Sequence, residues 1–591
     1  MLRWIGALVA VLAASAAVAG ALPARPEAAP LDTKTVKILL TLEHPRGLKR
    51  FAREVSSPDS KHYRDYRSTR HLIDRFGAEK KTRTRVLSWL RRRGIDGEVG
   101  RTRTWVTAEI SADQLPGSLF SSEGRARASR GRATTGRIPS PLRGAVSGAA
   151  TLSDFSQPSG PSPRVTAASS SWPNPPSSVR ERTGTPEGCG AGRTAGAPAP
   201  YQAFTPNQYT TAYGHAEMHA KGITGQGQRV ALVEYDDGFK RADIEAWAQC
   251  FGLRPPPIKR HRVGAPGRLP IRGEATLDLE VLTSAAPGLE AVDVYTVAFP
   301  SFSEGLLFAL PEAFGRRGAE PSVISMSLGI CEARQSESLV FNRALNSTFA
   351  IAAGAGISTV VASQDTGSAT CRVGGPNGTL PVMSASFPAT SQFVTAVGGT
   401  NFLLDADNRI TDQITWNDKP DLVAASGGGN SALFKRPWYQ RGLTGGKQQG
   451  GKGRAVPDVV GLADTTPGYA VYCGTPTCPW DGWTAIGGTS AATPLLAGGI
   501  ALANEQAAAV GQAGVGFLNP LLYRIGSGAR PERLFDDITV GNNDVGTAIP
   551  VAAGGGEPTG CCFAHAGYDR ATGWGSVDIP SLSRIARHAA P

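Results

Sequence analysis

Beyond residue 20 the sequence has no apolar run long enough to span a bilayer, so we expect no membrane anchor in the mature protein. It also has no nucleic-acid-binding motif in which aromatic residues interleave with basic ones, although its formal net charge is +12. Lysine and arginine instead crowd into residues 45–150. A nucleotide-binding fingerprint is missing too, because Gly225 and Gly227 precede a strand, whereas that fingerprint follows one.

Histidine is scarce, and none of the eight histidines lies in a familiar catalytic motif. His215 and His219 are four residues apart, but a zinc-peptidase helix needs Glu directly after the first His, and here Glu217 is two positions on. We predict an ordinary surface helix there. A zinc peptidase and a histidine-dependent serine peptidase are therefore both disfavoured.

The N-terminus and the cysteines indicate export. Residues 1–20 combine Arg3, an apolar stretch and the small-residue site Ala17-Val18-Ala19, which is typical of a signal peptide. Eight cysteines fit an oxidising compartment, so we expect a secreted, extracellular protein. Cys473 and Cys478 are expected to close a local loop, and Cys331 with Cys371 is the next pairing that we favour.

Composition divides the remaining chain into three parts. Residues 33–121 alternate strand and helix patterns and predict a small α+β domain. Residues 122–199 are rich in Ser, Pro, Gly and Arg and predict a disordered linker, because few large apolar residues are available for burial. A large domain follows over residues 200–591. This layout suits a secreted proenzyme and equally a multidomain binding protein.

The large domain alternates buried strands with helices, which predicts an α/β fold with a mostly parallel sheet and helices on both faces. The expected strands include 229–234, 292–295, 323–327 and 358–363, and the expected helices include 274–285, 336–353 and 491–508. Sites in such sheets lie at the carboxyl ends of strands. Ser325, Asp365 and the loop before Ser490 fall at or just beyond such ends.

Ser490 is the candidate nucleophile. Gly487 and Gly488 form a tight turn that delivers it to a helix N-terminus, although a plain N-cap serine would show the same pattern. Glu274 and Asp278 lie on one helical face and could act as a base and its orienting group; a solvated acidic pair is the alternative. Asp365 follows a strand and, if buried and protonated, could donate to an oxyanion, or it could simply form a turn.

Taken in order, the motifs Glu274-x-x-x-Asp278, Ser-x-Asp365-x-Gly-Ser and Gly-Thr-Ser490-x-x-x-Pro494 resemble those of the sedolisin family of serine-carboxyl peptidases. The segments 387–391, 397–400, 426–431 and 456–459 agree with that family. The first domain is similar to the family's activation propeptide. The resemblance covers nearly all of residues 35–580 except the linker.

The resemblance implies a subtilisin-like α/β fold and peptide hydrolysis at acidic pH. In that reading Ser490 is the nucleophile, Glu274 its general base, Asp278 the group that orients the base, and Asp365 part of the oxyanion hole. It also implies one Ca²⁺ ion, bound by the side chains of Asp537 and Asp569 and the carbonyls of Ile538, His565 and Gly567.

We therefore expect a monomeric acid endopeptidase that acts on proteins or peptides and is held by its own propeptide in cis. A tripeptidyl-peptidase of the same fold and a non-catalytic secreted binding protein are the alternatives. The family often has Trp-Gly where this chain has Leu328-Gly329, which leaves the subsite preference open. The propeptide cleavage site is expected somewhere between about 120 and 200.

Overall fold

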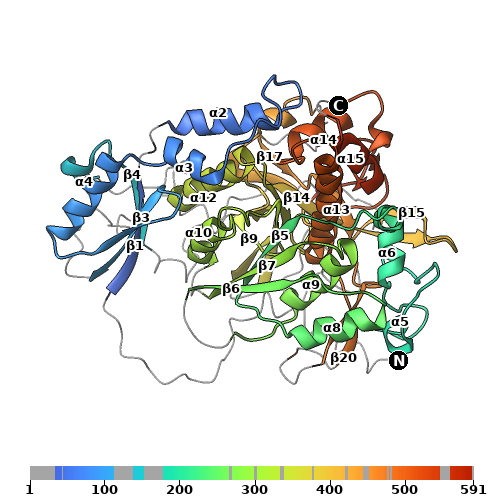
Figure 1. Cartoon of the computed structure of the whole chain (residues 1–591). Coiled ribbons are helices and arrows are strands. Elements are labelled where there is room, and N and C mark those ends of the chain that lie inside the picture. Colours follow the sequence, from blue (N-terminus) through green and yellow to red (C-terminus); the bar gives the residue numbers. More distant parts are fainter. Residues whose placement is uncertain are drawn as a thin grey trace, which may run out of the picture.

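The computed structural model describes residues 33–40, 42, 44–111, 138–151, 178–264, 269–298, 302–332, 339–375, 378–418, 424–443, 452–474, 478, 482–545 and 559–588. It shows a small N-terminal domain packed on a large domain with a central sheet (Figure 1). The signal peptide expected at residues 1–20 lies outside the described residues and stays a prediction.

The N-terminal domain is a four-stranded antiparallel sheet, in the order β2-β3-β1-β4, with three helices. Its buried side chains include Ile38, Val86, Trp89 and Val106, which form a core of its own. The mixed α+β architecture that the sequence predicts is therefore present. Its elements are β1 (Thr33–Leu40), α2 (Pro45–Ser56), α3 (Thr69–Phe76), α4 (Lys80–Arg91), β2 (Gly97–Val99), β3 (Trp105–Ser111) and β4 (Val146–Thr151).

The predicted linker at residues 122–199 is wrong at both ends. Strand β4 pairs with β1, so the N-terminal domain extends beyond residue 121 to Thr151. Ser178 is fully buried in the large domain, which therefore begins well before residue 200. Small residues such as those of β4 offer little apolar surface, but their backbone groups still complete a sheet, and composition does not register that. The linker segments 112–137 and 152–177 lie outside the described residues.

The large domain is built on a ten-stranded sheet in the order β21-β22-β18-β14-β10-β8-β5-β7-β6, with β15 paired to β14. Every pairing from β22 to β6 along that path is parallel. The bounds are β5 (Arg229–Tyr235), β6 (Ile258–Gly264), β7 (Ala291–Ala298), β8 (Val323–Met326), β10 (Ser358–Ala362), β14 (Thr395–Leu404), β15 (Ile410–Thr415), β18 (Val459–Leu462), β21 (Phe535–Asp536) and β22 (Ser576–Val577). The predicted mostly parallel sheet is confirmed.

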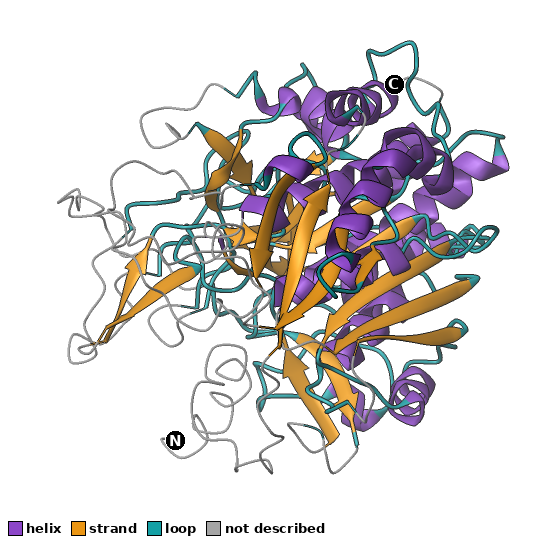
Figure 2. Ribbon diagram, turned by 90° about the vertical axis from the view of Figure 1, so that its left-hand side faces the viewer, coloured by secondary structure: helices purple, strands orange, loops and turns teal. Residues whose placement is uncertain are grey.

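Helices pack on both faces of this sheet (Figure 2). Alternate residues of one strand face opposite ways: Val230 and Leu232 lie in one core cluster, and Ala231 and Val233 in the other. The helices are α5 (Gly190–Arg193), α6 (Pro206–Ala212), α7 (His215–Ala220), α8 (Arg241–Cys250), α9 (Glu274–Ala285), α10 (Phe302–Glu312), α12 (Leu339–Gly354), α13 (Thr489–Ala509), α14 (Asn519–Gly526) and α15 (Ile579–Ala586). Short pairings outside the sheet are β9 (Ile330–Cys331) with β13 (Ser386–Phe387), β11 (Cys371–Gly375) with β12 (Gly378–Val382), β16 (Gly429–Lys435) with β17 (Gly453–Val456), and β19 (Tyr469–Cys473) with β20 (Gly482–Ile486).

Helix α7 is not the surface helix that the sequence suggested. The His215 ring is buried, and its Nε2 lies 3.1 Å from the carbonyl oxygen of Leu495 in α13. Burial lowers the pKa of His215 to about 3. This histidine is a neutral core residue, which a two-histidine spacing cannot distinguish from an exposed one.

The two domains share a hydrophobic cluster. Leu48 of α2 and Leu72 of α3 are buried in the same cluster as residues of α10 and α12. Figure 1 shows α2 and α3 beside α12. At the edge of this contact, the buried Arg64 donates from Nη1 to the carbonyl oxygen of Ala586 at 2.7 Å. Arg101 forms an ion pair with Glu312 at 2.7 Å. The N-terminal domain is therefore docked through both apolar and polar contacts.

Disulfides join several loops of the large domain. Cys473 is bonded to Cys478, as the sequence predicts, and Cys189 is bonded to Cys250. Adjacent Cys561 and Cys562 are also bonded to each other. Cys331 is disulfide-bonded as well, and its pairing with Cys371 stays a prediction. Among the described residues there is no helix that could cross a membrane by its length and hydropathy.

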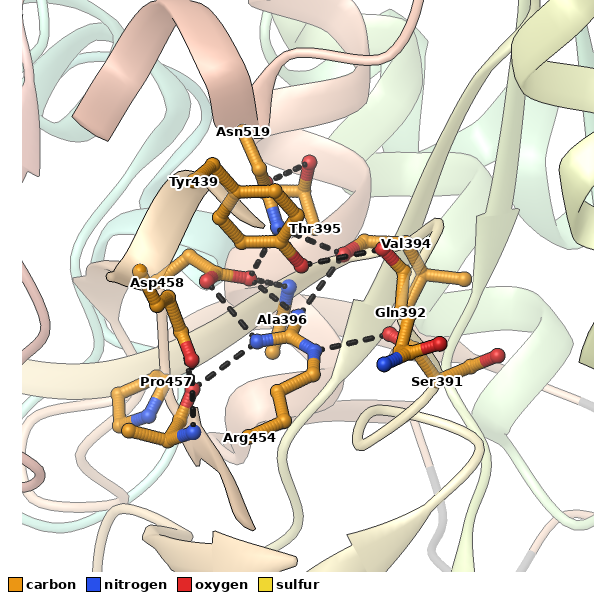
Figure 3. Close-up of polar contacts among 12 residues, drawn as sticks. Ser391, Gln392, Val394, Thr395, Ala396, Tyr439, Arg454, Pro457, Asp458 and Asn519 are labelled. Carbon is orange, nitrogen blue, oxygen red and sulfur yellow. Dashed lines mark hydrogen bonds and ion pairs between the residues drawn. The ribbon is translucent and has the colours of Figure 1, made fainter. Parts of the chain in front are cut away.

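A buried ion pair joins Arg454 in β17 to Asp458, the residue just before β18 (Figure 3). Both side chains are fully buried, and the guanidinium binds the carboxylate through both Nη atoms, at 2.7 and 3.1 Å. The remaining guanidinium donors bind the carbonyl oxygens of Ser391, Val394 and Ala455. The carboxylate also accepts from the amide of Asn519. Removing either partner of such a pair is strongly destabilising, because the charge of the other would stay buried without a counter-charge.

We expect Arg454→Met to lower the free energy of unfolding by about 3–5 kcal/mol, because it strands the Asp458 charge in the core. Urea unfolding of the full chain, followed by circular dichroism, measures the loss. Arg409→Met is the matched control, since Arg409 forms only an exposed ion pair with Asp407. Equal unfolding midpoints for the two variants would contradict the expectation.

Candidate active site

Ser490 is the second residue of α13, and a two-glycine turn presents it. Gly488 has φ 120° and ψ 155°, a conformation that residues with a side chain rarely adopt. A Cβ added at Gly487 would lie 2.2 Å from the carbonyl oxygen of Asp464. The Gly488 N–H donates to the carbonyl oxygen of Ala463 at 2.6 Å. The turn is thus packed directly on the segment that follows β18, and only glycine fits there.

Glu274 opens helix α9 and meets the nucleophile. Its carboxyl faces the Ser490 hydroxyl closely enough for that hydroxyl to stabilise the charged form of the acid. Burial raises the pKa of Glu274 well above its ordinary value, the charge of Asp278 raises it further, and the Ser490 hydroxyl lowers it in part. The residue that the sequence suggested as the base therefore lies beside the candidate nucleophile.

Asp278 lies one helical turn further along α9 and is fully buried, so this is no solvated acidic pair. Burial raises the pKa of Asp278 to about 8, while interactions with the Ser327 hydroxyl and the Glu234 carboxyl lower it. Ser327 itself donates to the backbone carbonyl of Ser490 at 3.0 Å. Ser327 therefore contacts both the nucleophile's backbone and the carboxyl behind the base.

Two further carboxyls belong to this cluster and were missed by sequence reasoning. Glu234, near the end of β5, is buried, and burial together with the charge of Asp278 raises its pKa well above the ordinary value. Asp237 accepts from the backbone N–H of Arg272 and Ala275 and so caps the start of α9. A signal for Glu234 existed: it is a charged residue inside an otherwise apolar strand pattern.

Asp365 lies in the loop after β10, beside the turn at Gly487 and Gly488. Its Oδ1 accepts from both the backbone N–H and the hydroxyl of Thr489, at 2.8 and 2.9 Å. Its Oδ2 lies 3.0 Å from the position that a Cβ on Gly488 would take, so a side chain there would crowd this oxygen. Burial raises the pKa of Asp365, and the bonds from Thr489 lower it in part. Asp365 is therefore placed to keep a proton on Oδ2 in acid.

The five residues that the sequence suggested as calcium ligands lie on loops that meet beside β21. The Gly567 N–H donates to Asp537 Oδ2 at 2.7 Å, and the His565 N–H donates to Asp569 Oδ2 at 2.9 Å. The Thr572 hydroxyl links Asp569 to the carbonyl oxygen of Ile538. Burial raises the pKa of Asp569 to about 6 and also raises that of Asp537. The exposed Asp537 carboxyl, the buried Asp569 carboxyl and the Ile538 carbonyl supply oxygen donors, the kind that a hard cation prefers.

Comparisons with known proteins agree with the two-domain architecture. The family model described as "Pro-kumamolisin, activation domain" matches residues 24–155, and the "Subtilase family" model matches residues 303–513. The chain is 33% identical to kumamolisin of Bacillus sp. (strain MN-32) over 383 residues, which cover 63% of this chain and 62% of that relative. It is 30% identical to tripeptidyl-peptidase 1 of Mus musculus over 562 residues, which cover 90% of this chain and 88% of that relative.

Among solved structures, the fold is similar to that of Pseudomonas sedolisin, a serine-carboxyl proteinase, in complex with two molecules of pseudo-iodotyrostatin. The TM-score is 0.54 at 27% sequence identity, and the match covers 66% of this chain and 98% of that one. Both the N-terminal domain and the large domain thus have counterparts among these related peptidases.

Proposed function

The chain belongs to the sedolisin family of serine-carboxyl peptidases, and from this premise we propose that it is an exported, acid-acting endopeptidase in which Ser490 is activated by Glu274. The meeting of Ser490 with the buried carboxyls of Glu274 and Asp278 on one side and of Asp365 on the other carries the proposal. Because the base is a carboxyl and not an imidazole, the working range lies in acid. The family supplies the peptidase activity and the activation domain; the endopeptidase mode and export are the proposed refinements.

In the proposed reaction the Ser490 oxygen attacks the carbonyl carbon of the scissile peptide bond, and its proton passes to Glu274. Asp278 orients Glu274 and, with Glu234 behind it, keeps protons within the cluster. The oxyanion accepts hydrogen bonds from the Ser490 N–H and from a protonated Asp365 Oδ2. Collapse of the intermediate breaks the C–N bond, and Glu274 returns its proton to the leaving amine. Water then repeats the sequence on the acyl-enzyme and releases Ser490.

The docked N-terminal domain is the chain's own propeptide. Its release needs a cut between Thr151, the last residue of β4, and Ser178, which is buried in the catalytic domain. This interval is narrower than the sequence alone allowed. We infer a monomeric product in which the Cys189–Cys250 disulfide holds the new N-terminal segment to α8. Disulfides of this kind, together with the signal-like residues 1–20, support export.

We propose that Asp537 and Asp569, with the carbonyls of Ile538, His565 and Gly567, bind one Ca²⁺ ion that stabilises the loops around β21. Chelation with EDTA should therefore lower the melting temperature by several degrees, since a ligand at one hundred times its Kd stabilises by about 2.7 kcal/mol. Differential scanning fluorimetry measures the shift. Asp537→Asn is the matched variant and should show a low melting temperature with no response to EDTA. A wild-type melting temperature that ignores EDTA would refute the site.

The second candidate is a tripeptidyl-peptidase, which the long match to mouse tripeptidyl-peptidase 1 favours. We expect the acid-activated enzyme to cleave an internally quenched peptide with an acetylated N-terminus at pH 4 about as fast as the same peptide with a free N-terminus. A tripeptidyl-peptidase must bind the free amino group in order to place the third peptide bond of the substrate at the catalytic serine. Loss of cleavage of the acetylated peptide, measured by fluorescence and mass spectrometry, would therefore reject the endopeptidase and select the alternative.

A further inference from the structure

A second pair of buried carboxyls, Asp418 and Asp464, lies outside the catalytic cluster. Both side chains are fully buried, and each comes from a different loop: Asp418 follows β15 and Asp464 follows β18. One hydroxyl, that of Ser178, lies close to an oxygen of each carboxyl, so the two acids meet in a buried site where charging both of them is unfavourable. The reaction derived above makes no use of this pair.

Ser178, the first residue of the catalytic domain that the structure describes, closes over the pair. The Ser178 hydroxyl donates to Asp464 Oδ2 at 2.5 Å and lies 3.4 Å from Asp418 Oδ1. It also accepts from the backbone N–H of Asn417 at 2.7 Å, and the Ser178 N–H donates back to the Asn417 carbonyl at 3.0 Å. The side chain of Asn401 holds the Ser178 carbonyl. Ser178 is thus bound on every polar atom by the loops that carry the acid pair.

The same two loops support both sides of the catalytic turn. Asp418 is bonded through its N–H to the carbonyl of Ala424, and the next residue, Ala425, donates to the carbonyl of Asp365 at 3.0 Å. Asp464 lies in the segment on which Gly487 and Gly488 are packed, directly before Ser490. The loop that carries Asp418 therefore leads to the backbone of Asp365, and the loop that carries Asp464 leads to the turn just before Ser490.

We propose that Asp418 and Asp464, clasped over Ser178, are positioning residues that hold the N-terminal segment and the catalytic turn in place only while the pair keeps a shared proton. This inference rests on the proposed peptidase function for its consequence, since it places Ser490 and Asp365 under the control of that proton. It leaves the catalytic steps themselves unchanged.

The surroundings of the pair support a dependence on protonation. Burial raises the pKa of Asp464 to about 6 and, together with the charge of Asp464, raises that of Asp418 well above its ordinary value. Among the described residues, the groups that donate hydrogen bonds to the two carboxyls are neutral: the hydroxyls of Ser178 and Thr465 and the backbone N–H of Thr466. The basic side chain two residues from Ser178, that of Arg180, instead pairs with Asp412 at 2.8 Å.

The sign follows from linkage. In the unfolded chain these carboxyls lose their protons near pH 4, whereas in the folded chain they retain them to about pH 6 or above. Between those values the folded state binds more protons, so stability from the clasp falls as pH rises. Above the folded pKa two like charges face each other in a buried site, and the clasp opens.

The test is hydrogen–deuterium exchange on the full chain carrying Ser490→Ala, so that neither self-digestion nor catalysis enters the measurement. We expect protection factors of the peptides that begin at Ser178 and that contain Gly487 and Gly488 to fall at least tenfold between pH 4.5 and pH 7.5. Adding Asp418→Asn should hold them within threefold of their acid values. An asparagine amide can donate to Asp464 and accept from Thr465 at any pH, as a protonated Asp418 does.

Asp407→Asn, at an exposed site, is the control and should behave as the parent. Equal protection at both pH values, or an equal fall with and without Asp418→Asn, would overturn the proposal. If the Asp418→Asn chain does not fold, Ser178→Ala replaces it; unchanged protection of the N-terminal peptide at pH 4.5 in that variant would also overturn it. Because exchange is read on an inactive chain, these outcomes are separate from a failure of wild-type protein to cleave peptides in acid.

Discussion

Replacing Ser490 with alanine is expected to abolish both self-processing and peptidase activity, with a fall in kcat of at least about 10³-fold. At pH 3–5 the wild-type chain should shorten to its catalytic domain, with a new N-terminus between residues 152 and 178. The variant should stay at full length, because Glu274 would have no hydroxyl proton to accept. Gel electrophoresis and N-terminal sequencing over a time course measure this.

Ser527→Ala is a suitable control for that experiment, because Ser527 is exposed just beyond α14. It should shorten at the wild-type rate. Adding a trace of active enzyme to the Ser490→Ala chain separates the two activities, since cleavage in trans should then release the propeptide without restoring turnover. Self-shortening of Ser490→Ala alone would remove Ser490 from the mechanism.

Replacing Asp365 with alanine should lower kcat by about 10²–10³-fold with little change in KM, because its hydrogen bond forms only to the developing oxyanion. The same carboxyl predicts the pH dependence. Its pKa is raised above the ordinary value by burial, and only the protonated form donates. Activity is therefore present below that pKa, falls as pH rises through it, and vanishes towards neutral pH.

Peptide hydrolysis between pH 3 and pH 8, measured after activation, gives the profile of the wild-type enzyme. Asp407→Ala, in an exposed ion pair, is the matched control and should keep both kcat and the profile. Full wild-type activity at pH 8 would contradict the roles of both Glu274 and Asp365. An Asp365→Ala enzyme with an unchanged kcat would contradict the oxyanion role alone.

Much of the catalytic centre could be predicted because its residues carry strong local patterns. Helix α9 begins and ends where the apolar periodicity does, and the turn at Gly487 and Gly488 has a glycine requirement that the sequence shows directly. The pairing of Glu274 with Ser490, by contrast, spans two distant elements. It could be expected only from the order of several motifs, since helical spacing alone does not distinguish a buried acidic pair from a solvated one.

What sequence reasoning missed depends on contacts rather than patterns. Glu234 belongs to the catalytic cluster because it faces Asp278 and Glu274 of the neighbouring helix α9, and the sequence of β5 alone does not indicate that contact. Strand β4 is composed of small residues and is stabilised by its pairing with β1. Ser178 lies in a segment of linker-like composition, yet it is buried by loops from more than two hundred residues away. Tertiary context overrides composition at each of these places.

The hydrophobic cluster shared by the propeptide domain and α12 has a consequence for the enzyme once the propeptide has been released. Gly354, the last residue of α12, lies against Leu72 and Phe51 of the propeptide domain, so release of the propeptide uncovers the C-terminal end of α12. The free catalytic domain then exposes apolar surface that the full chain buries. We expect its unfolding to be harder to reverse than that of the full chain, so that its working life is set by how fast it unfolds.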